Sequence, residues 1–277
     1  MKIYGDKFNN ILIKANKIEM GSDVSFGKNI NVDIRGIFTI GDRSHLGNNV
    51  KIVGNNVSFG SDLYHSDGLN IGGGGHANPT ANFTMGDRCT IHNNYINLAK
   101  EIVIGDDVGL SLDVSIQTHG YWLSVLEGYP TKFAGVSIND GVIAGFRSVI
   151  LMGVTIAKNI VIGACSVVTK NLTEPSGVYV GNPARFIKKV VPLSTAEKIK
   201  KVDYIIDEYK KITEHHNMSS FIEINYPVIA IDDCNFNVET SQFNGLENEY
   251  TDHFRDYIRK WGIRFYSNRP FKSIIKG

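Results

Sequence analysis

Aliphatic residues recur every six positions through the middle of the chain. The positions on one uninterrupted phase are Ile138, Ala144, Ile150, Ile156, Ile162 and Val168. Small or β-branched residues follow them at fixed offsets, as Gly145 and Gly163 do. A helix repeats every 3.6 residues and a strand every two, so neither produces this period. A coil with three flat faces does produce it, because one aliphatic side chain per face points inward and a small residue turns each corner.

Shorter runs of the same pattern precede this one. They start at Met20, Ile40, Met85 and Ile104. The phase slips between runs, and each slip predicts a loop, of which two are long, at 60–83 and 117–135. Three hexads make a coil of about 18 residues, and stacked coils lie about 4.8 Å apart, as hydrogen-bonded strands do. Residues 18–185 therefore predict a parallel β-helix of roughly eight coils.

The pattern changes near residue 190. Ser194 with Glu197 has the spacing of a helix-initiating capping box. The predicted elements beyond it are a helix from Ser194, strands at 220–231 and 234–240, a helix over 250–261 ending at Gly262, and a strand at 263–266. The sequence thus predicts a mainly β protein with two domains, a β-helix over 1–191 and a small α+β domain over 192–277.

Composition narrows the functional classes. Lys and Arg number 29 against 28 Asp and Glu, and this balance argues against a nucleic-acid or anionic-lipid partner. No apolar run approaches about 18 residues, so we expect no membrane span, and the first residues lack the apolar core of a signal peptide. Cys89, Cys165 and Cys234 have no metal-ligand spacing. We expect unpaired thiols, no metal site and a reducing, cytoplasmic location.

Two ordered motifs close the repeat: Ile162–Lys170, which reads IGACSVVTK, and Gly181–Arg185, which reads GNPAR. Together they resemble the hexapeptide-repeat acyltransferases, and the resemblance is strongest over 100–190. It implies a left-handed β-helix, acetyl-CoA as acyl donor, and a homotrimer with active sites between neighbouring prisms.

The segment Ile104–His119, IGDDVGLSLDVSIQTH, resembles the stretch before the catalytic histidine of maltose and galactoside O-acetyltransferases. Colanic-acid and sialic-acid capsule acetyltransferases share it. The chain departs from that group in two places. His119 follows Ile116 more closely, and Ile143 stands where those enzymes have tryptophan.

Acyl transfer from a thioester needs a base for the acceptor's proton and a donor for the new oxyanion. His119 is the candidate base, because histidine titrates near neutrality. The candidates for acceptor binding are His92, Asn94, Tyr121, Trp122 and Glu127. The aromatic pair could stack on a sugar or anchor the loop on the next subunit, and Glu127 could orient His119 or be solvated. A solvated or Asn-bonded His92 is the alternative to a ligand-binding one.

The resemblance also implies a cofactor groove between adjacent coils. Phe146 matches the position whose backbone N–H meets the thioester region, and Ala164 matches the one that binds the pantetheine arm. The positions matched near the adenine and phosphates are Thr169, Lys170, Arg185 and Lys188. Basic side chains there suit the negative nucleotide end, although a lone basic residue is more often only solvated.

The sequence therefore favours transfer of acetyl from acetyl-CoA to a hydroxyl of a sugar or surface polysaccharide. N-acetylation of a nucleotide-linked amino sugar uses the same scaffold and is the first alternative. A β-helix that serves as an inactive structural or binding module is the second.

Overall fold

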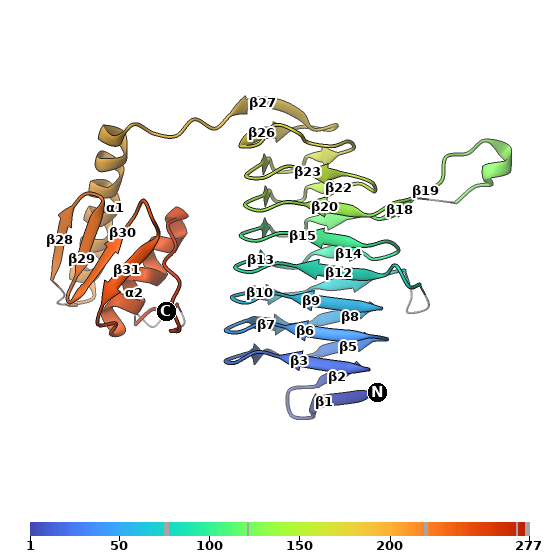
Figure 1. The fold of residues 1–277 in the computed structure, drawn as a ribbon, viewed down its shortest axis with the longest axis horizontal. Coiled ribbons are helices and arrows are strands. Elements are labelled where there is room, and N and C mark those ends of the chain that lie inside the picture. The colour runs from blue at the N-terminus through green and yellow to red at the C-terminus, as the bar shows by residue number, and fades with distance from the viewer. Residues whose placement is uncertain (75–77, 121, 219–220, 270, 275–277) are drawn as a thin grey trace. The chain divides into compact units, whose positions relative to one another are not determined.

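The computed structural model describes residues 1–74, 78–120, 122–218, 221–269 and 271–274. The chain divides into two compact units, Met1–Val190 and Val191–Gly277. The first unit is a stack of coils in which the chain visits three sheets in turn (Figure 1). Within these three sheets neighbouring strands are parallel, except where β1 pairs with β2 and β26 pairs with β27.

The three sheets form the three faces of the coil. Sheet A contains β1 (Lys2–Asp6), β2 (Ile11–Ala15), β5 (Ile30–Ile34), β8 (Val50–Gly54), β11 (Asn70–Gly72), β14 (Tyr95–Asn97), β17 (Ser115–Ile116), β22 (Val149–Ile150) and β25 (Val167–Val168). Sheet B contains β3 (Lys17–Met20), β6 (Ile37–Ile40), β9 (Asn56–Phe59), β12 (Asn82–Met85), β15 (Ile102–Ile104), β20 (Val136–Ile138) and β23 (Thr155–Ile156). Sheet C contains β4 (Ser25–Phe26), β7 (His45–Asn48), β10 (Tyr64–Asp67), β13 (Thr90–Ile91), β16 (Gly109–Leu110), β21 (Ile143–Ala144), β24 (Val161–Ile162), β26 (Gly177–Val180) and β27 (Arg185–Lys189).

The aliphatic residues that recur every six positions form the core of the coil. All six residues from Ile138 to Val168 on that phase are buried, each at most 1% exposed. Corners bring successive coils into close contact, and a Cβ at Gly41 would lie 2.5 Å from the backbone nitrogen of Ser61. Only glycine permits that approach. The predicted fold class, a mainly β protein with a parallel β-helix of hexapeptide repeats followed by a small α+β domain, is confirmed.

The prediction of a long loop at 60–83 is wrong over most of that segment. The coil continues through β10 and β11, so the segment 60–72 belongs to the stack. His65 takes the inward position there, in register with Leu46 and Ile91, and its side chain is fully buried. A polar residue on the aliphatic phase hid this coil from the sequence pattern.

The second expected loop does leave the coil. It opens and closes with a short antiparallel pair, β18 (His119–Gly120) and β19 (Lys132–Phe133), and carries the 3-10 helix η1 (Val125–Glu127). In Figure 1 this segment projects from the side of the stack.

The second unit packs two helices with an antiparallel sheet. Its elements are α1 (Thr195–His215), β28 (Ile222–Asn225), β29 (Val228–Ile231), β30 (Cys234–Asn237), β31 (Gln242–Gly245), α2 (Glu249–Ile258) and the 3-10 helix η2 (Arg259–Trp261). The capping box of Ser194 and Glu197 begins α1 as expected. The strand expected at 220–231 is instead a hairpin that turns at Tyr226-Pro227, and 263–266 is not a strand. Among the described residues, no helix is long and apolar enough to span a membrane.

Candidate active site

His119 stands where the chain leaves sheet A. Two residues separate it from the end of β17. With its cross-strand partner Phe133, it forms the root of the projecting loop. The imidazole stacks on the Phe133 ring, with centroids 5.4 Å apart and planes 10° apart. This stacking holds the half-buried ring in one orientation at the corner between sheets A and B.

Asn97 fixes the tautomer of His119. Its amide oxygen Oδ1 lies 2.6 Å from His119 Nδ1. The hydroxyl of Thr118 accepts a hydrogen bond from the backbone N–H of Ala99 and lies 2.7 Å from Asn97 Oδ1 and 2.9 Å from Asn97 O, either of which can accept its hydrogen. Because an amide oxygen can only accept, Nδ1 is the donor to Asn97 Oδ1, and the neutral imidazole carries its lone pair on Nε2. That tautomer is the one a general base at Nε2 requires.

Asn97, the hydrogen-bond partner of His119 Nδ1, is a residue that the sequence analysis did not assign to the site. It ends β14, one coil before His119, and its side chain is buried. The signal was available in the register, because Ile96 of β14 pairs with Ile116 of β17. Counting coils would have placed residue 97 beside the segment that leads to His119.

The loop residues expected on the acceptor side are exposed. Glu127 lies in η1 with an exposed side chain, while His119 Nδ1 bonds to the amide oxygen of Asn97. Trp122 is 90% exposed, and Leu126 beside it in the loop is 95% exposed. Tyr121 lies outside the described residues.

His92 and Asn94 lie at a different corner from His119. Both follow β13, where the chain passes from sheet C to sheet A. His92 Nδ1 is 2.8 Å from Ser66 Oγ, and burial lowers the pKa of His92 below its usual value. The side chain of Asn94 is buried and bonded to the backbone, donating to Ser111 O and accepting from His92 N–H. Asn94 is thus a corner residue of the coil, which corrects its expected place on an acceptor-facing surface.

The two matched backbone positions for the cofactor share the corner from sheet C to sheet A. Phe146 follows β21 and Ala164 follows β24, one coil further along. The backbone N–H of Cys165 donates to the Phe146 carbonyl at 2.7 Å, which stacks the two corners in register. Within the described ranges, neither Phe146 N–H nor Ala164 N–H donates to another residue. Both amides are therefore available to an extended ligand.

The four residues expected near the nucleotide end are exposed, but they do not gather. Thr169 and Lys170 follow β25 and precede the bridge of Leu172 to sheet B, so they share the corner of His119. Arg185 and Lys188 lie on β27, at the end of sheet C. One copy of the chain therefore divides the predicted site between the two corners that flank sheet A.

Comparisons with known proteins agree with the motifs. No protein-family profile matches the chain. Galactoside O-acetyltransferase of Escherichia coli (strain K12) is 33% identical over 140 residues, which are 50% of this chain and 63% of that protein. The mitochondrial gamma carbonic anhydrase 2 of Arabidopsis thaliana is 30% identical over 105 residues, 36% of each chain. The chain thus spans less than two thirds of these relatives.

Among solved structures, a maltose O-acetyltransferase from Clostridium difficile 630 is 23% identical, with a TM-score of 0.30, over 65% of this chain and 70% of that one. Over half of its length, this chain is therefore similar in sequence to a galactoside O-acetyltransferase.

Proposed function

We propose that the protein transfers acetyl from acetyl-CoA to a hydroxyl of a sugar or surface polysaccharide, with His119 as the general base. The observation that carries this proposal is the Asn97–His119 hydrogen bond, which leaves the imidazole lone pair on Nε2. Nε2 takes the acceptor's proton as its oxygen attacks the thioester carbonyl. The tetrahedral intermediate then releases the CoA thiolate, which takes that proton from the imidazolium, and the products are the acetyl ester and CoA.

The backbone amides of the opposite corner suit the donor. In this proposal the Phe146 N–H meets the thioester oxygen, where a fixed donor stabilises the developing charge. The Ala164 N–H binds the pantetheine arm one coil further on. Lys170 and Arg185 meet the phosphates, with Thr169 and Lys188 beside them, since charge-assisted bonds to phosphate are stronger than neutral ones.

A site shared between copies follows from the division over two corners. In a cyclic homotrimer whose sheets A face the axis, the His119 corner of one copy meets the Phe146 corner of the next. The exposed loop supports the same arrangement, because Trp122 and Leu126 are 90% and 95% exposed and apolar side chains of that size are normally covered. The neighbouring copy would cover them. His92 would then border the acceptor from the second copy.

The decisive experiment measures thiol release from acetyl-CoA in the presence of separate acceptor panels. Free sugars and oligosaccharides should support turnover, with an acetyl ester as product by mass spectrometry. Turnover with nucleotide-linked amino sugars alone, giving an amide, would replace the proposal by N-acetylation. Absence of release with every panel would favour an inactive binding module. Use of acetyl-CoA and three unpaired cysteines also favour a cytoplasmic enzyme.

A further inference from the structure

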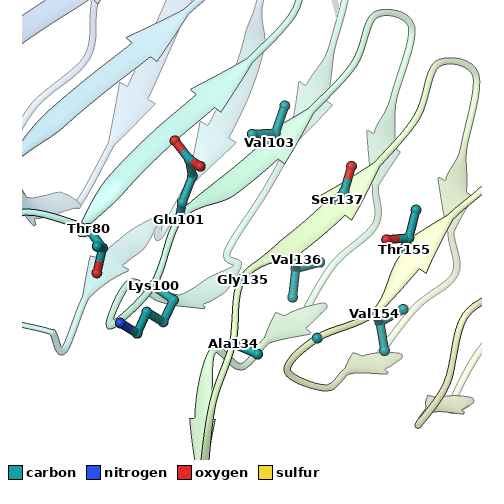
Figure 2. Close-up of a pocket in the computed structure, with 11 residues that line it drawn as sticks. Thr80, Lys100, Glu101, Val103, Ala134, Gly135, Val136, Ser137, Val154 and Thr155 are labelled. Carbon is teal, nitrogen blue, oxygen red and sulfur yellow. The ribbon is translucent and has the colours of Figure 1, made fainter.

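An open groove lies on sheet B beside the projecting loop. Its volume is about 370 Å³, and Figure 2 shows its lining. The residues around it come from three levels of the coil: Thr80, Lys100, Glu101, Val103, Ala134, Gly135, Val136, Ser137, Gly153, Val154 and Thr155. No residue assigned to the base or to acetyl-CoA lines this groove.

Two glycines line the groove. Asn82 and Glu101 occupy the position just before the core residue of β12 and β15, and Gly135 and Gly153 take this position in the next two coils. The backbone there is closely stacked, since Gly153 N–H donates to Gly135 O at 2.9 Å. A Cβ on Gly135 would lie 2.5 Å from Glu101 O, so the backbone of the preceding coil already occupies that space. The groove is therefore an open depression along these close-packed glycines, and no side chain extends from them into it.

The walls combine hydroxyl groups with an apolar floor. Ser137 and Thr155 are in register on successive strands, and within the described residues neither side-chain hydroxyl has a hydrogen-bond partner. Val103 precedes them in the same column and is 43% exposed. Lys100 and Glu101 stand at the other end of the groove (Figure 2). A pyranose ring offers the matching surface, because its C–H face packs on apolar groups while its hydroxyls bond at the edge.

The rim of the groove adjoins the residues that hold His119. Ala134 on its rim directly follows Phe133, whose ring stacks on His119. The backbone N–H of Ala134 donates to Thr118 O at 3.0 Å, which ties the rim to the residue before His119. A chain of sugars with one residue at His119 can therefore continue into the groove. Successive coils are about 4.8 Å apart, close to the length of one sugar along a glycan chain.

We propose that this groove binds the sugars adjacent to the one that is acetylated, so that the acceptor is a glycan chain rather than a free monosaccharide. The inference rests on the proposed function for its reaction, while the binding itself does not depend on catalysis. Ser137 and Thr155 bond sugar hydroxyls, and Val103 packs against a ring face. Lys100 and Glu101 orient the chain at the end nearest His119, because the Lys100 N–H donates to Thr118 Oγ1 at 3.2 Å.

The test uses a variant that fills the groove and a matched control on the same column. Thr155→Tyr places a ring over the hollow, and tyrosine is well tolerated on an exposed strand position. Ser58→Tyr makes a similar change on β9, outside the groove. The probes are glucose to maltohexaose, N-acetylglucosamine to its hexamer, and sialic acid to its hexamer. Binding is measured by calorimetry, and transfer is measured by thiol release.

We expect the wild-type affinity to rise with chain length in at least one series. Thr155→Tyr should weaken hexamer binding about tenfold, as loss of one or two hydrogen bonds does, and leave monomer binding and the KM for acetyl-CoA unchanged. Ser58→Tyr should match wild type. Affinity independent of length in all three series, or equal hexamer affinity in the two variants, overturns the proposal. Length-dependent binding without any acetyl transfer would support the groove and reject the proposed function instead.

Discussion

His65 is a histidine in the place of an aliphatic core residue, and replacing it should stabilise the coil. Its side chain is 0% exposed, and neither ring nitrogen has a hydrogen-bond partner among the described residues. Leu46 and Ile91 hold the corresponding positions in the coils on either side. Leucine at position 65 would continue that stack. At neutral pH, His65→Leu should raise the free energy of unfolding by about 2 kcal/mol, because it removes unsatisfied buried polar atoms.

The gain should grow as the solution is acidified. Burial lowers the pKa of His65 from 6.5 to about 4 in the folded protein. Above the unfolded pKa the ring is neutral in both states and contributes no pH dependence. Below it the unfolded chain takes up the proton first, so stability falls between pH 6.5 and about 4. The pKa difference of 2.5 units corresponds to about 3 kcal/mol over that window, at 1.36 kcal/mol per unit.

Urea denaturation of wild type and His65→Leu at about pH 7.5, 6 and 5 measures this difference directly. Subtracting the two curves removes the titration of the other groups, which both proteins share. The stabilisation should increase steadily toward low pH. A difference that stays constant across the series would mean that the ring is solvated or protonated inside the coil, and the account of its burial would be wrong.

Other predictions concern the site and the assembly. Asn97→Ala should lower kcat about 10- to 100-fold, since the Nδ1–H of His119 loses its acceptor. Asn97→Asp should move the acid limb of the pH–rate profile to higher pH, because a carboxylate favours the protonated imidazole. Unchanged profiles would exclude a positioning role for Asn97. Lys170→Ala and Arg185→Ala should each cost about 1–3 kcal/mol in kcat/KM for acetyl-CoA, with the acceptor KM unchanged, and wild-type CoA binding in both would refute the assignment. Light scattering should give a mass three times that of one chain, which is 30.7 kDa. The double variant Trp122→Ser/Leu126→Ser should give a lower mass. A fully active monomer would rule out the shared site.

The fold could be predicted because each coil repeats the same inward position. Ile138 and its phase partners are buried as the period of six requires. The prediction failed at 60–72, where a fully buried His65 replaces the aliphatic residue. It also failed in the second unit, where Pro227 turns a predicted strand into a hairpin. Local patterns report the average burial of a segment. Single residues such as His65 and Pro227 decide where a coil continues and where a strand ends.

The site was less accessible to the sequence because its parts are distant along the chain. The flanking motif identified His119 as a candidate base, but Asn97 is 22 residues away and meets it only through the stacking of coils. Asn94 lies nearer the expected acceptor position and is instead bonded inside a corner. The groove beside Gly135 and Gly153 is invisible to motif matching, since its lining comes from three coils whose residues are distant along the chain.

The central claim is that His119 is the base for acetyl transfer, and the kcat of His119→Ala tests it most directly. Once an acceptor is identified by thiol release, the variant should lose about 10²–10⁴ in kcat, the range for removal of a general base. Its affinity for acetyl-CoA should equal that of wild type, because the matched cofactor positions lie elsewhere. His92→Ala, the matched control at the other corner, should lose much less. A near-normal kcat in His119→Ala would contradict the account, and loss of activity in His92→Ala alone would transfer the role to His92.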